Sequence, residues 1–203
     1  MKERFVRAIQ EQPIEKPGQG FSKLNIHIPI REQAWNYCIA INSDIRAITN
    51  SYVDFSSISF QIPHITLYMG YVTSEANYSE IMMAVSQFTL TCKPFQISFS
   101  KPYLKHPKRT YAFLDVCESS RIINMKRQLH ALLNAYIEPL NWDVVEEAPH
   151  ITIAYIKTNF DEVEAKLKKM PPAPVMNAAA IEVSFCGPYG SCLGSIRCFE
   201  CGG

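Results

Sequence analysis

The sequence predicts an α+β fold built on antiparallel sheets, and two observations support this prediction. Strand and helix patterns follow each other in mixed order, with strands in direct succession in each half, as is typical of α+β proteins. A short pattern also recurs, since residues 63–67 read Pro-His-Ile-Thr-Leu and residues 149–153 read Pro-His-Ile-Thr-Ile. In a chain of 203 residues, this recurrence indicates one domain over residues 21–200, made of two duplicated lobes, separate or interleaved.

The first half of the chain contains six expected elements after a polar lead-in. Residues 1–20 form this lead-in, in which Pro and Gly end a short helix near residues 3–11. Alternating apolar and polar residues predict a strand over 24–28, and an apolar stripe at helical spacing predicts a helix over 31–49. The other expected elements are a strand over 60–72 with Pro63 near its beginning, a helix over 78–91, and strands over 95–99 and 111–116, paired as a hairpin.

The second half begins with the strongest helix pattern of the chain. Between residues 119 and 136, aliphatic side chains recur on one side and basic or amide side chains lie elsewhere. The other expected elements are a strand over 149–156, an amphipathic helix over 160–170 that ends at two prolines, and strands over 180–185 and 195–200 around a turn-rich segment.

The charge balance narrows the possible functions. The chain has 20 basic and 19 acidic residues, so its formal net charge is +1. Such a balance argues against a general nucleic-acid coat, which needs a strongly basic face.

No apolar run is long enough to span a bilayer, and the first seven residues contain no signal-peptide core. We therefore expect a soluble, cytoplasmic protein without a membrane partner, and a monomer.

The seven cysteines are expected to be reduced thiols, because their number is odd and no secretion signal precedes them. Cys198 and Cys201 form a Cys-x-x-Cys pair that could bind zinc in an interaction domain. Cys186 and Cys192 do not supply a second such pair, which favours buried or unreactive thiols. We expect no metal and no cofactor.

The repeated His-x-Thr pattern carries the chemistry. Because side chains alternate along a strand, His64 and Thr66 share one face, and so do His150 and Thr152. If the lobes face each other, one imidazole could take a proton from a nucleophile while the other protonates the leaving oxygen of a phosphodiester. The threonine hydroxyls could hydrogen-bond the phosphoryl oxygens. A structural repeat without chemistry is the alternative, and zinc binding by the two histidines lacks a third ligand.

At these residues the chain resembles the two-histidine (2H) phosphoesterase superfamily, which includes cyclic nucleotide phosphodiesterases and so-called 2′-5′ RNA ligases. The family signature is two His-x-Thr/Ser motifs about eighty residues apart, matched here at 64–66 and 150–152. The resemblance implies a bilobal, pseudo-symmetric α+β fold, with two antiparallel sheets facing a central cleft and helices packed outside. Several members carry Arg five residues after the second His, where this chain has Tyr155.

Further residues are candidates for substrate contacts. Tyr68 shares the face of His64 by strand alternation, whereas Tyr155 has the family position but the opposite parity unless the strand bulges. Tyr103 and Tyr189 lie in expected loops that could reach a nucleobase. An acid-free stretch could attract phosphate or could be a solvated hairpin loop; its basic residues are Lys101, Lys105, His106, Lys108 and Arg109. His27 and His130 are expected to be structural.

The resulting hypothesis is a metal-independent phosphodiesterase in which one of His64 and His150 is the general acid and the other the general base; the sequence does not say which. The resemblance implies substrates such as 2′-5′-linked oligonucleotides, including oligoadenylates, or 2′,3′-cyclic phosphates on nucleotides and RNA ends. The partner would be a small nucleotide or short RNA rather than a long duplex. The alternative is a module that binds RNA ends or cyclic nucleotides without turnover.

Overall fold

The computed structural model describes residues 23–140 and 145–202, so the expected lead-in over residues 1–20 and its helix lie outside the described residues. The described helices are α2 (Glu32–Ile48), α3 (Asn77–Thr91), α4 (Ser119–Leu133) and α5 (Phe160–Lys168), with a 3₁₀ turn at Pro188–Gly190. The strands are β1 (Lys23–Pro29), β2 (Gln61–Ile62), β3 (His64–Val72), β4 (Phe95–Ile97), β5 (Tyr103–Leu104), β6 (Tyr111–Asp115), β7 (Ile137–Pro139), β8 (His150–Tyr155), β9 (Met176–Ala178), β10 (Ala180–Cys186) and β11 (Cys192–Glu200). None of the described helices is long and apolar enough to cross a membrane.

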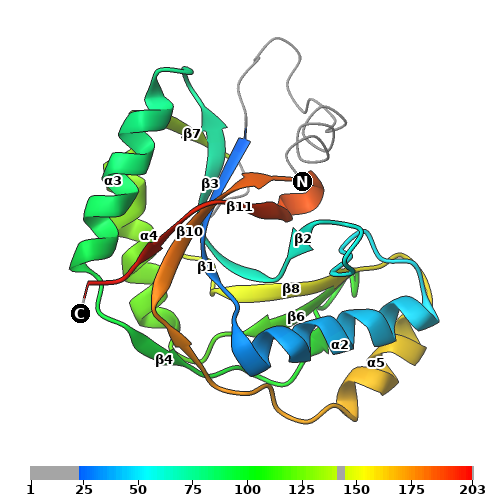
Figure 1. Ribbon diagram of the computed structural model, residues 1–203. Coiled ribbons are helices and arrows are strands. Elements are labelled where there is room, and N and C mark those ends of the chain that lie inside the picture. Colours follow the sequence, from blue (N-terminus) through cyan, green and yellow to red (C-terminus); the bar gives the residue numbers. More distant parts are fainter. Residues whose placement is uncertain (1–22, 141–144, 203) are drawn as a thin grey trace.

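The strands form antiparallel sheets, as predicted. The largest has the order β2-β11-β10-β1-β3-β7, a second has the order β5-β6-β8, and β4 pairs with β9. Figure 1 shows α3 and α4 together beside the large sheet, and α2 and α5 together beside the strands β6 and β8. The α+β fold class is confirmed.

The chain crosses between the two sheets. Helix α2 follows β1 of the large sheet but packs on β8 of the small one. Helix α4 follows β6 of the small sheet but packs on β3 of the large one. Each His-x-Thr strand is therefore backed by a helix that follows a strand of the other sheet, and the two sheets cannot separate without unpacking these helices.

Two features of the expected strands are wrong. The strand expected over 60–72 is broken at Pro63, where the ring removes a backbone donor, so β2 pairs with β11 while β3 pairs with β1 and β7. The expected hairpin of 95–99 with 111–116 is also wrong, because β6 pairs with β5 and β8 while β4 pairs with β9. A single bridge from Phe99 to Val116 remains between the two segments.

Asn42 joins α2 to the small sheet. Its side chain is buried, and its Nδ2 atom donates to the carbonyl oxygens of Val53 at 2.9 Å and Ile153 at 2.8 Å. Its Oδ1 atom accepts from the backbone nitrogen of Phe55 at 3.0 Å. The sequence pattern places this amide on the apolar side of the helix, where all three hydrogen bonds are shielded from water.

We predict that Asn42→Ala lowers the free energy of unfolding by about 2–4 kcal/mol, because it leaves buried backbone groups without partners. Urea denaturation followed by circular dichroism measures the change. Asn36→Ala, on the exposed side of the same helix, is the matched control. Equal stability of the two variants would contradict this role of Asn42.

Candidate active site

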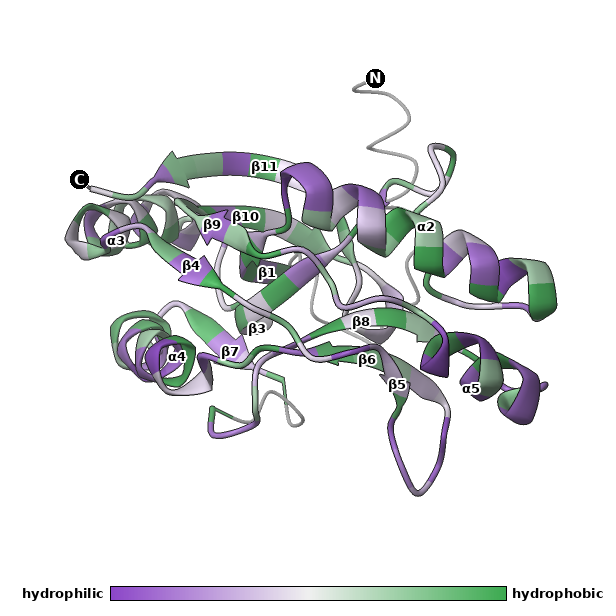
Figure 2. Ribbon diagram, turned by 90° about the horizontal axis from the view of Figure 1, so that it is seen from below, coloured by the Kyte–Doolittle hydropathy of each residue, from purple (hydrophilic) through white to green (hydrophobic). Residues whose placement is uncertain are grey.

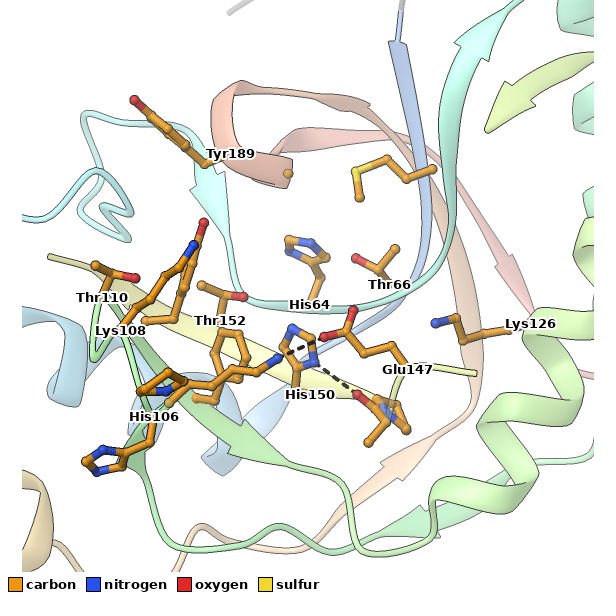
Figure 3. Close-up of a pocket in the computed structure, with 18 residues that line it drawn as sticks. His64, Thr66, His106, Lys108, Thr110, Lys126, Glu147, His150, Thr152 and Tyr189 are labelled. Carbon is orange, nitrogen blue, oxygen red and sulfur yellow. Dashed lines mark hydrogen bonds and ion pairs between the residues drawn. The ribbon is translucent and has the colours of Figure 1, made fainter. Parts of the chain in front are cut away.

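The two His-x-Thr motifs meet at one cavity of about 550 Å³. Figure 3 shows His64 and Thr66 on β3, and His150 and Thr152 on β8, with the side chains directed into this cavity. The intervening aliphatic side chains are fully buried on the opposite faces of the strands. The structure thus brings together the four residues that the sequence singled out.

Both motif strands contain a bulge at the same place. On β3, Thr66 lies opposite His27 and Tyr68 lies opposite Ile26, so one residue of β3 has no partner. On β8, Thr152 lies opposite Phe113 and Ala154 lies opposite Ala112, which leaves one residue of β8 without a partner. An extra residue reverses the alternation of side chains beyond it.

The bulge makes the prediction for Tyr68 wrong. Tyr68 is fully buried, its hydroxyl donates to the carbonyl oxygen of Ile137 at 2.9 Å, and its ring lies 4.2 Å from that of His130. Met69, one residue further, lines the cavity instead.

The corresponding bulge in β8 turns Tyr155 toward the face of the strand that carries His150 and Thr152. Its ring lies 4.8 Å from that of Tyr111 and 4.9 Å from that of Tyr189, both of which line the cavity. Tyr52 packs against Tyr155 and Tyr189 as well, which completes a cluster of four tyrosines. Tyr155 therefore supports the cavity wall from behind.

Two other expected substrate contacts lie away from the cavity lining. The Tyr103 hydroxyl donates to both carboxylate oxygens of Asp115, at 3.0 and 2.9 Å. Arg109 forms ion pairs with Asp161 at 2.8 Å and Glu164 at 2.7 Å on α5. Neither side chain is part of the cavity lining, so the structure does not support the two expected contacts.

The loop between β5 and β6 supplies other basic residues. Lys105, His106 and Lys108 line the cavity, and Figure 2 shows that this loop is hydrophilic and projects from the small sheet. Lys105 also forms an ion pair with Glu147 at 3.0 Å. The loop thus carries positive charge to the rim of the cavity next to His150.

The two imidazoles are held in the same way. His64 Nδ1 lies 2.9 Å from the carbonyl oxygen of Ile62, and His150 Nδ1 lies 3.0 Å from that of Ala148. Because a carbonyl can only accept, Nδ1 carries the proton in each ring. Nε2 is left on each ring as the nitrogen that can take up a further proton.

The surroundings of the two rings differ in charge. Burial lowers the pKa of His64 to about 3, and the nearby imidazoles of His27 and His150 contribute to this lowering. Burial also lowers the pKa of His150, and Lys105 acts in the same direction. The hydrogen bond to the Ala148 carbonyl and the carboxylates of Glu147 and Asp115 oppose this effect. A single proton shared by the pair is therefore better accommodated on His150 than on His64.

The sequence interpretation missed two polar residues of the site. Asn25 on β1 is buried, and its Nδ2 atom lies 3.3 Å from both His64 Nε2 and Thr66 Oγ1. Lys126 on α4 is only 5% exposed and lines the cavity. Its position, four residues after Ile122 on the apolar stripe, is a signal that could have identified it.

The described residues contain no cluster of three or more His, Cys, Asp or Glu side chains able to hold a metal ion. All seven cysteines are free thiols. Cys198 Sγ lies 3.0 Å from Nη2 of Arg31, whereas the thiol of Cys201 lies near that of Cys92. The Cys-x-x-Cys pair therefore faces two different sets of neighbours.

A family model described as the 2′-5′ RNA ligase superfamily matches residues 39–183, and the chain belongs to this family. Among solved structures, it is similar to TT0787 of Thermus thermophilus, with a TM-score of 0.63 and 15% identity over 89% of this chain and 98% of that one. Escherichia coli LigT in the apo form is also similar, with a TM-score of 0.61 and 12% identity over 90% and 99% of the two chains. Kluyveromyces marxianus Usb1 has a TM-score of 0.52 and 11% identity over 89% and 98%. A comparison with curated proteins gave no match.

We predict that His64 remains neutral from pH 8 down to pH 5, because its lowered pKa of about 3 places protonation well below this range. Nitrogen-15 NMR of the imidazole measures its protonation, and the His64→Gln variant assigns the signal. A His64 signal that titrates near pH 6.5 would contradict the described surroundings.

Proposed function

We propose that the protein is a metal-independent phosphodiesterase of the 2H type. The observation that carries this proposal is that two imidazoles, each with Nδ1 held by a backbone carbonyl, open into one cavity together with two threonine hydroxyls. General acid-base catalysis of phosphodiester cleavage needs such a pair of groups, one to accept a proton and one to donate it.

In the proposed mechanism, His64 is the base and His150 is the acid. His64 Nε2 takes the proton from the attacking oxygen, which is a neighbouring ribose hydroxyl in a 2′-5′ linkage or water in a 2′,3′-cyclic phosphate. Attack on phosphorus breaks the bond to the leaving oxygen, which receives a proton from His150 Nε2. The assignment rests on the carboxylates of Glu147 and Asp115, which favour the imidazolium of His150.

The threonines and one lysine stabilise the phosphoryl group in this mechanism. Thr66 and Thr152 follow the histidines on the same strand faces, so their hydroxyls can donate to the non-bridging oxygens as charge develops. Lys126 adds a cation to the cavity wall. No step of the mechanism is assigned to a metal ion.

The proposed substrate is a short nucleotide, such as a 2′-5′-linked oligonucleotide or an RNA end with a 2′,3′-cyclic phosphate. The cavity volume of about 550 Å³ lies in the range of small-ligand sites rather than of duplex grooves. The solved structures of LigT include complexes with phosphate, 3′-AMP, ATP and NADP+.

The proposal includes a monomer in the cytoplasm, where seven free thiols remain reduced.

A module that binds nucleotides without turnover is the second candidate. It is favoured by one observation, the lowered pKa of both imidazoles, which disfavours their protonated forms. Incubation with 2′,3′-cyclic nucleotides and a panel of 2′-5′ oligoadenylates separates the candidates, because the module would bind these compounds and form no product.

We predict that His64→Ala and His150→Ala each lower kcat on the substrate found in this panel by about 10²–10⁴, the usual contribution of one general acid or base. EDTA should have no effect. His130→Ala is the control, since His130 packs against Tyr68 outside the cavity lining. A fully active single variant, or loss of activity in EDTA, would contradict the mechanism.

We predict that Tyr189→Ala raises KM for a nucleotide substrate more than it lowers kcat. Tyr189 is 47% exposed, lines the cavity, and has a left-handed backbone with φ of 56°, which is unusual for a bulky residue. Stacking of a base on an aromatic ring contributes about 1–3 kcal/mol, so KM should rise roughly 5- to 150-fold. Tyr189→Phe should retain binding. Equal KM values for the wild-type protein, Tyr189→Ala and Tyr189→Phe would exclude stacking of a base on Tyr189.

A further inference from the structure

A buried imidazole, that of His27, lies behind His64. His27 on β1 is fully buried and lies opposite Thr66 in the β1–β3 pair, so both side chains belong to the same face of the sheet. Its ring centroid is 5.3 Å from that of His64, with the rings at 66° to each other. This titratable group touches the proposed base but has no part in the mechanism described above.

His27 has partners on its own strand and on neighbouring strands. Its Nε2 atom lies 3.7 Å from Oε2 of Glu182, which is opposite it on β10, and Glu182 in turn pairs with Arg31 at 3.3 Å. Its Nδ1 atom lies 3.4 Å from the carbonyl oxygen of Asn25 and 3.6 Å from Sγ of Cys192 on β11. Nδ1 thus faces a carbonyl and a thiol, whereas Nε2 has an ion-pair contact with Glu182 that is too long for a hydrogen bond.

The other half of the site has a different residue in the same position. Phe113 lies opposite Thr152 at the matching bulge, as His27 lies opposite Thr66. The Phe113 ring stacks on His150 with centroids 4.0 Å apart and an angle of 16°. One imidazole is therefore supported by an apolar ring, and the other by an imidazole paired with a carboxylate.

We propose that His27, held by Glu182, is a positioning residue that packs against His64 and disfavours the imidazolium form of His64. This inference rests on the proposed function, because it explains why His64 rather than His150 accepts the proton. The physical reason is that two neighbouring imidazoles in a buried site cannot both carry a proton without strong repulsion.

The surrounding charges support this role. Next to burial, His27 is the largest influence that lowers the pKa of His64. The titratable and charged groups that face His27 are Glu182 from β10, Cys192 from β11 and His64 from β3, with Arg31 acting on Glu182. Glu182, whose side chain is only 12% exposed, places its carboxylate beside His27, on the ring that packs against His64.

The His27→Phe variant tests the proposal, because it places a phenylalanine beside His64, as Phe113 already lies beside His150. We expect the NMR titration midpoint of His64 to rise by at least one pH unit. The acidic limb of the pH profile of kcat/KM should shift to higher pH by the same amount. This corresponds to about a tenfold loss of rate at a given pH on that limb, while KM changes little. Glu182→Gln should shift both in the same direction while nearly preserving the size of the side chain.

His130→Phe is the matched control, since it makes the same exchange at a histidine that touches Tyr68 rather than His64. Thermal melting identifies the folded variants, and Glu182→Gln carries the test if His27→Phe does not fold. An unchanged His64 titration in folded variants would overturn the proposal, as would a loss of rate that is equal at all pH values. A shifted His64 titration in a protein without phosphodiesterase activity would leave this inference standing and reject the proposed function.

Discussion

The site depends on the alternation of side chains along β3 and β8. Ile65 and Leu67 behind the first motif, and Ile151 and Ile153 behind the second, are fully buried. Full burial of each such side chain stabilises the fold by about 1.5–3 kcal/mol. A slip of one residue in either strand would expose these aliphatic groups and bury the His and Thr side chains. The hydrophobic core therefore fixes the direction of the polar groups, including imidazoles whose charged form is unfavourable.

The sequence predicted the elements that have a clear period, such as β1, α2 and α4, because their periodicity reflects the face they bury. It did not predict β5, β7 and β9, since strands of two or three residues are too short to show a period. The partner of β6 was predicted wrongly because strand pairing is a tertiary property: β8, one of its two neighbours, begins 35 residues after β6 ends, on the far side of α4.

The place of a site residue was predictable where it depends on residues nearby in the sequence. It was not predictable where it depends on contacts with distant segments. His64 and Thr66 share a face because they are two residues apart, as do His150 and Thr152. Tyr68 was misplaced because the bulge arises from pairing with β1, and no feature of the motif itself signals an extra residue. Arg109 was misassigned because its carboxylate partners lie 52 and 55 residues away in the sequence.

In the proposed mechanism, a phosphodiester would supply negative charge next to the two imidazoles. Lys105 is paired with Glu147 at the rim, and these two groups act in opposite directions on the pKa of His150. A bound phosphodiester brings a negative charge next to both imidazoles, which raises the pKa of each and opposes the effect of burial. This rise in pKa favours protonation of His150 first, because Glu147 and Asp115 also raise the pKa of His150. On His64, His27 opposes the rise. Substrate binding would then create the one-proton state that acid-base catalysis needs, and the difference between the two halves would decide where that proton lies.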